Sequence, residues 1–149
     1  MSDYFSESDL ERIEKAVSDA EKNTSGEIKV VIRMDFDKEF SGDIDRQALH
    51  DFDAHGLANT RDKTGVLVLM VLSAKQFKIL ADKGIYEKAG KWYFEEIALA
   101  AGIMFMTGRF ADGLVEAVAE IGRKLAFHFP RKSDDTDELP NKPVFEESN

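Results

Sequence analysis

The chain has 149 residues, 20 of them basic and 29 acidic, so its formal net charge is −9, and it contains no cysteine. This length is typical of a single domain. The lack of cysteine excludes disulfides, thiolate zinc sites and cysteine nucleophiles, and an acidic chain without a basic stripe is not expected to bind nucleic acid.

The N-terminal segment predicts a helix followed by a strand. Ser6 is a favourable N-cap with Asp9 three residues later, and apolar residues then recur at helical spacing as far as Ser25 and Gly26. Residues 27–34, EIKVVIRM, are rich in β-branched side chains, which is typical of a short strand.

The next segment predicts a helix and two more strands. Residues 44–56 are amphipathic, whereas residues 65–72 are apolar throughout, so both faces of this second strand should be covered. Residues 73–76 form a tight turn before a third strand at residues 77–81. Because a helix joins the first two strands, they should be parallel, and the turn should make the third strand antiparallel to the second.

The C-terminal half predicts two helices, at residues 87–106 and 110–128, and Pro130 then closes a domain of residues 1–130. Residues 131–149 hold six acidic and three basic side chains and several helix breakers, so we expect an acidic disordered tail. This order of elements predicts an α/β fold, a three-layer α/β/α sandwich with a small mixed central sheet of three to four strands and about four helices.

Membrane and export signals are not evident. The first ten residues have neither a basic region nor an apolar core, so they do not resemble a signal peptide. No segment approaches the ~20 apolar residues of a membrane-spanning helix. We therefore expect a cytoplasmic protein without a membrane span.

The predicted topology places acidic residues together at one rim of the sheet. The starts of the first two strands and the end of the third should meet there, which would bring together Glu27, Asp62 and Asp82 with Arg61. Oxygen-rich clusters suit Ca²⁺ or Mg²⁺, and an arginine can clamp a phosphate. The competing interpretation is that Asp62 and Asp82 only form turns and that Glu27 is solvated.

The opposite rim offers a second candidate. Asp35 and Asp37 follow the first strand, and ligands of open α/β sheets usually lie beyond the carboxyl ends of the strands. The competing interpretation is a charged loop. His50 and His55 are five residues apart, about 140° around a helix, so they do not share a face as metal ligands.

Three segments resemble the TPM domain family. They are TSGEIKVVI, TRDKTGVLVLMVLSAKQFKILADKGI and GRFADGLVEAVAEIGRKLAFHFP, and the resemblance extends over about residues 5–130. It implies an α/β/α sandwich, acid phosphatase activity in some relatives, and an acidic pocket for divalent cations such as calcium in others. On this resemblance Asp62 and Asp82 fall on acidic positions beside the pocket, and Glu27 and Arg61 match a variant of bacterial soluble proteins.

Three functions follow as hypotheses. The favoured one is a binding or accessory module for a protein partner, with an acidic pocket for a divalent cation. The second is a weak cation-dependent phosphatase, in which Asp62 and Arg61 are catalytic and the metal ligands are Glu27, Asp62 and Asp82. The third is a purely structural domain.

Overall fold

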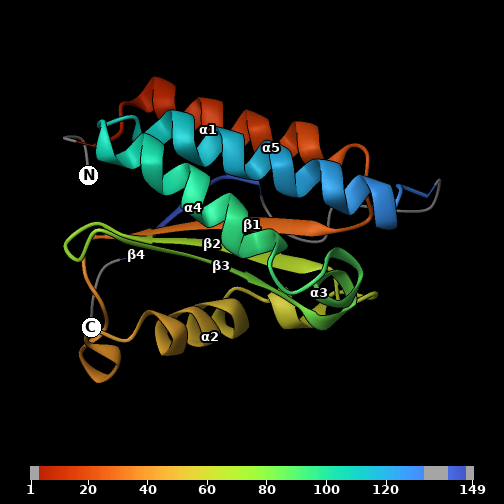
Figure 1. Ribbon diagram of the computed structural model, residues 1–149, viewed down its shortest axis with the longest axis horizontal. Helices are drawn as coiled ribbons and strands as arrows, with labels where there is room; N and C mark the ends of the chain where they lie inside the picture. Colours follow the sequence, from red (N-terminus) through yellow and green to blue (C-terminus); the bar gives the residue numbers. More distant parts are fainter. Residues whose placement is uncertain (1–3, 133–140, 147–149) are drawn as a thin grey trace.

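The computed structural model describes residues 4–132 and 141–146 and contains one mixed sheet with the strand order β3-β2-β1-β4 (Figure 1). β1 (Glu27–Arg33) pairs in parallel with β2 (Gly65–Val71). β2 pairs antiparallel with β3 (Gln76–Ala81). Both predicted strand directions are therefore confirmed.

Helices cover both faces of this sheet, which confirms the predicted three-layer sandwich (Figure 1). One face packs against α1 (Glu7–Glu21), α4 (Tyr93–Met106) and α5 (Phe110–His128). The other face packs against α2 (Ile44–Ala54) and the short helix η2 (Leu57–Asn59). Every residue of β2 is buried, as expected for a strand with both faces covered.

The predicted helix at residues 87–106 is instead two helices, α3 (Lys83–Ala89) and α4. Gly90 separates them with a φ of +97°, a conformation that other residues rarely adopt. Asp82 begins α3, because its side chain accepts a hydrogen bond of 2.8 Å from the backbone N–H of Lys83. The sequence pattern predicted one helix across Gly90, so it did not identify this boundary between α3 and α4.

The expectation of a disordered tail is wrong for residues 144–146. These residues form β4 (Val144–Glu146), which pairs in parallel with the second half of β1. Pairing satisfies backbone groups at an otherwise open edge of the sheet, and Phe145 packs 6.2 Å from the ring of Phe5. The sheet therefore extends beyond residue 130. Residues 133–140 and 147–149 of the predicted tail lie outside the described residues.

Candidate functional site

The rim predicted from the strand order exists at the level of the backbone. Glu27 lies opposite Gly65 in the register of β1 and β2, and the N–H of Asp82 donates to the carbonyl of Gly65 at 2.9 Å. The N–H of Ile85 donates to the carbonyl of Lys63 at 3.3 Å. The segments around Glu27, Asp62 and Asp82 therefore meet at one edge of the sheet.

The carboxylates at this rim face different surroundings. Glu27 is buried, Asp82 caps α3, and Asp62 lies 3.9 Å from the guanidinium of Arg61 with both side chains partly exposed. Within the described part of the chain, Glu27, Asp62 and Asp82 do not place their ligand atoms within 4.8 Å of one another. The catalytic roles of Arg61 and Asp62 and the metal-binding role of the three carboxylates stay predictions.

Glu27 belongs to a buried group of charges that also contains Glu21 and Lys29. Burial lowers the pKa of Lys29, and the negative charges of Glu21 and Glu27 oppose this shift. Glu21 also accepts a hydrogen bond of 2.8 Å from the N–H of Ile28, which joins the end of α1 to β1. Glu27 and Glu21 therefore both place negative charge next to buried Lys29.

The opposite rim does gather potential ligands. Asp37, which follows β1, and His50 and Asp51 of α2 each offer a ligand atom, and these atoms lie within 4.8 Å of one another. Asp37 and Asp51 are buried and His50 is exposed. The group lies at the carboxyl end of β1, where ligands of open α/β sheets usually bind.

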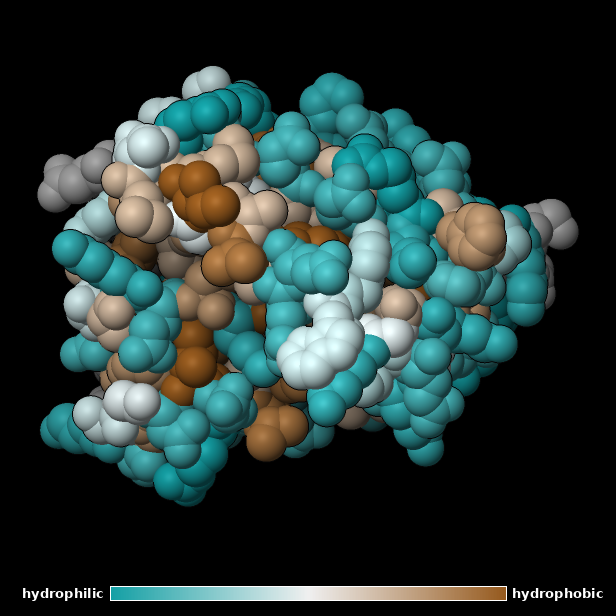
Figure 2. All heavy atoms as spheres, viewed as in Figure 1, coloured by the Kyte–Doolittle hydropathy of each residue, from teal (hydrophilic) through white to brown (hydrophobic). Residues whose placement is uncertain are grey.

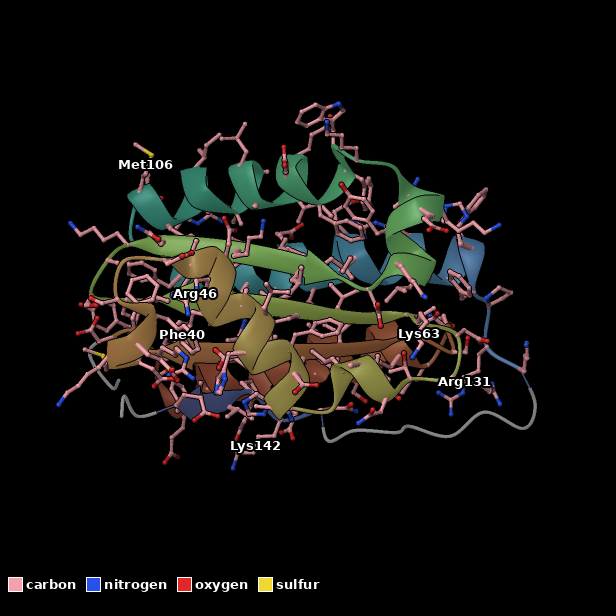
Figure 3. All side chains as sticks on the ribbon, turned by 90° about the horizontal axis from the view of Figure 1, so that it is seen from below. Phe40, Arg46, Lys63, Met106, Arg131 and Lys142 are labelled. Carbon is pink, nitrogen blue, oxygen red and sulfur yellow. The ribbon has the colours of Figure 1, made fainter. Side chains whose placement is uncertain are left out.

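His50 is positioned by an aromatic neighbour. Its ring centroid lies 5.2 Å from that of Phe40, which belongs to the short helix η1 (Lys38–Phe40). The guanidinium carbon of Arg46 lies over the Phe40 ring, 5.1 Å from its centroid. Figure 3 shows Phe40 and Arg46 side by side at this end of the molecule. The loop after β1 is thus packed onto α2 around the imidazole.

A buried arginine already joins the two carboxylates. Arg33 donates from Nε and NH2 to the two oxygens of Asp51 at 2.7 and 2.6 Å, and from NH1 to Asp37 Oδ1 at 3.1 Å. Gln47 Nε2 donates to Asp37 Oδ2 at 3.1 Å and to Asp51 Oδ1 at 3.2 Å. Burial lowers the pKa of Arg33, but the hydrogen bond and charge of Asp51 and the charge of Asp37 outweigh it and hold the pKa above its usual value.

The network keeps an excess of negative charge. One guanidinium faces two carboxylates, so the formal charge of Arg33, Asp37 and Asp51 together is −1. Glu146 of β4 adds to the negative field at Arg33, and its carboxylate also contacts His55 at 2.7 Å. Two carboxylates suit Ca²⁺ or Mg²⁺, and the imidazole nitrogen of His50 extends the donor set to Mn²⁺ and Zn²⁺. Asp37, His50 and Asp51 are therefore a group that could hold a metal ion, beside an arginine that already bonds to both carboxylates.

Sequence reasoning found Asp37 at this rim but missed His50 and Asp51. The sequence pattern addressed only whether His50 and His55 share one face of a helix. In the structure, the ligand atom of His50 lies near that of Asp37, which belongs to the loop after β1. One signal was available in the sequence. Glu27, Lys29 and Arg33 are separated by two and four residues, so they share one face of the predicted strand, and charged side chains on such a face need partners.

The family model for the TPM domain matches residues 1–124. The chain belongs to the TPM domain family. Among solved structures, this TPM domain is similar to the NMR structure of the BA42 protein from the psychrophilic bacterium Bizionia argentinensis, with 34% sequence identity, 96% of each chain covered and a TM-score of 0.85. The comparison with curated proteins found no match.

The surface of the TPM domain includes an exposed apolar strip on α4. Leu99, Ile103 and Met106 are 71%, 62% and 86% exposed, and Figure 2 shows hydrophobic side chains gathered over this helix. Nevertheless, none of the helices in the described residues has the length and apolar character needed to cross a membrane.

Proposed function

We propose that this TPM domain is a binding or accessory module that takes a divalent cation at the carboxyl end of β1. Asp37, His50 and Asp51 would hold the cation. The observation that carries this proposal is the approach of their ligand atoms to within 4.8 Å of one another, from two separate segments. The exposed imidazole gives the cation access from solvent, and the two buried carboxylates supply the charge.

Arg33 sets the character of this site. Because its guanidinium already bonds to both carboxylates, an incoming cation is repelled by one positive charge while it is attracted by two negative charges. We therefore expect reversible binding of moderate strength. The cation would tie the loop containing Asp37 to α2, so its effect would be to hold this loop and the surface around it in one arrangement.

The second candidate is the cation-dependent phosphatase at the opposite rim, with Arg61 and Asp62 as catalytic residues. It is supported by the convergence of the three backbone segments, which the bond from Asp82 to Gly65 illustrates. It ranks second because the carboxylates of Glu27, Asp62 and Asp82 do not approach one another as those of the first candidate do. A phosphatase of this kind should lose its turnover of a phosphate monoester on the change Asp62→Asn.

Thermal unfolding with added cations tests the first candidate against the second. A cation that binds only the folded state adds about 2.7 kcal/mol at 100 times its dissociation constant, so Mn²⁺, Zn²⁺, Ca²⁺ or Mg²⁺ should raise the melting temperature relative to the chelated protein. His50→Ala should reduce this shift for Mn²⁺ and Zn²⁺ without unfolding the protein, because His50 is exposed. Asp62→Asn should leave it unchanged.

Two outcomes would contradict this assignment. One is a melting temperature of the unaltered protein that changes with none of the four cations, which would favour a purely structural domain. The other is loss of the rise in melting temperature in Asp62→Asn while His50→Ala keeps it. This result would place the cation site at the rim of Glu27, Asp62 and Asp82. Isothermal titration calorimetry of the same proteins measures the binding directly.

A further inference from the structure

One edge of the sheet has unpaired backbone groups. β3 is an outer strand, and Asp82 bonds directly across to Gly65. Bonded and non-bonded pairs alternate along an antiparallel ladder, so Lys78 and Leu80 also direct their backbone groups toward β2. Phe77, Ile79 and Ala81 direct theirs outward. Within residues 4–132 and 141–146, no hydrogen bond reaches these outward groups.

A groove of about 330 Å³ runs along this edge. In Figure 1, β3 lies with α4 above it and α2 below it. The groove is lined by Lys78, Ile79, Leu80, Ala81, Lys83, Tyr86, Lys91, Phe94 and Glu95. The strand itself therefore forms one wall of the groove.

The charge of the groove is opposite to that of the whole protein. Three lysines, Lys78, Lys83 and Lys91, face one carboxylate, Glu95, in a chain whose net charge is −9. Lys78 is paired with Asp45 of α2 at 3.3 Å. Lys83 and Lys91 have no ion pair within the described residues, so they are available to carboxylates of a partner.

Two exposed aromatic residues flank the groove. Tyr86 on α3 is 41% exposed, and Trp92 at the start of α4 is 59% exposed. Lys91 Nζ lies 4.8 Å from the centroid of the Trp92 ring. Tyrosine and tryptophan are among the side chains most enriched at the centres of protein interfaces. Here Tyr86 lines the groove, and Trp92 follows Lys91 of its lining directly in the chain.

We infer that the free edge of β3 binds an extended acidic segment of a partner protein, which adds to the sheet as a further strand. The backbone of the segment pairs with the outward groups of Phe77, Ile79 and Ala81, and its carboxylates meet Lys83 and Lys91. The same sheet already accepts a short extended segment at its other edge, where β4 pairs with β1.

Charge decides against a second copy of this chain as the occupant. Pairing β3 with β3 across a dimer axis would bring Lys78, Lys83 and Lys91 of both copies together, and like charges in an interface are repulsive. The described C-terminal residues of the chain lie on β1, at the far edge of the sheet. This inference goes beyond the proposed cation site, which lies near the other end of the strands, and does not depend on it.

Fluorescence anisotropy with a labelled octapeptide of alternating glutamate and valine tests the inference. We expect saturable binding that is weakened about tenfold by Lys83→Glu and by Lys91→Glu. The same charge reversal at Lys22, which is exposed at the end of α1, should leave it unchanged. An octapeptide of alternating lysine and valine should not bind. All titrations are run with a chelator and again with Mn²⁺. Peptide binding that is the same in both conditions shows that the result does not depend on the proposed cation site.

Amide hydrogen exchange supplies a readout specific to strand addition. The peptide should protect the amides of Phe77, Ile79 and Ala81, and those of Lys78 and Leu80 should change little because they already bond to β2. Two further peptides carry N-methyl groups at alternate residues, one at its valines and the other at its glutamates. Only one of these two sets of N–H groups can face β3, so one methylated peptide should bind at least about tenfold more weakly than the other.

The inference is overturned by three results. The first is absence of binding by the acidic octapeptide. The second is equal binding of the lysine octapeptide, or of both methylated peptides. The third is a dimer in analytical ultracentrifugation that protects the amides of Phe77, Ile79 and Ala81 without peptide, because a second copy would then occupy the edge.

Discussion

Arg33→Met should lower the free energy of unfolding by about 3–5 kcal/mol, because it removes the cation from a buried network and leaves Asp37 and Asp51 facing each other away from water. Methionine keeps an unbranched apolar side chain in place of the first part of the arginine and removes the guanidinium, so the loss reports the charge, its hydrogen bonds and the space that the guanidinium filled. Urea denaturation followed by circular dichroism measures the change.

An exposed arginine provides the matched control for this substitution. Arg12 bonds to Asp112 at 2.6 Å, as close as the shortest contact of Arg33, but it lies at the surface. Exposed pairs contribute little because water and salt screen them, so Arg12→Met should have a much smaller effect. Equal effects of the two substitutions would show that the Arg33 network is not an important source of stability.

The Arg33 variant also bears on the proposed cation site. With the guanidinium removed, a divalent cation is the natural replacement for the missing positive charge, since convergent carboxylates repel one another without one. Mn²⁺ should therefore recover part of the lost stability in the variant, and the recovery should require His50. If Mn²⁺ stabilises neither the variant nor the unaltered protein, the cation proposal fails at this rim.

Gly84→Ala should destabilise the protein by about 3 kcal/mol, at the upper end of the range for overpacking. A Cβ at this position would lie 2.5 Å from the carbonyl oxygen of Lys63 and closer still to that of Asp62. Both contacts are with backbone, so no rotamer change relieves them. The turn containing Asp62 would have to move away from the start of α3. Thermal and urea unfolding measure the loss.

Gly102→Ala is the control with the opposite sign. Gly102 lies inside α4, and a Cβ there would meet no atom within 4 Å. Alanine is favoured over glycine in a helix by roughly 0.5–1 kcal/mol, so this variant should be more stable than the unaltered protein. A Gly84→Ala protein as stable as the unaltered one would mean that the Asp62 turn yields without cost.

Arg33→Met and Gly84→Ala test the two rims of the sheet separately, because different interactions hold each rim together. The rim of Asp37, His50 and Asp51 is held by the charge of Arg33 and by hydrogen bonds from Arg33 and Gln47. The rim of Glu27, Asp62 and Asp82 is held by close backbone packing at Gly84. A ligand at the first rim must therefore compete with an internal cation, whereas a ligand at the second must use side chains that the backbone alone does not bring together.

Much of this fold is determined by local features of the sequence. Ser6 and Asp9 form the expected capping box at the start of α1, and the apolar run at residues 65–72 contains β2, buried throughout. The helix between β1 and β2 makes them parallel, and the short turn after β2 makes β3 antiparallel, as predicted. These features depend on periodicity, caps and connection length, which neighbouring residues specify.

Only the tertiary structure decided which charged residues meet. Arg33 and Asp51 are 18 positions apart, and Val31 pairs with Val144 of β4. Strand order correctly placed Glu27, Asp62 and Asp82 at one edge, but it did not specify the direction of their side chains. That direction depends on which other groups lie nearby: the charges of Glu21 and Glu27 act on buried Lys29, and Asp82 accepts a hydrogen bond from the first N–H of α3. The sequence by itself therefore determined the layers and the rims, and long-range packing determined the chemistry that each rim can perform.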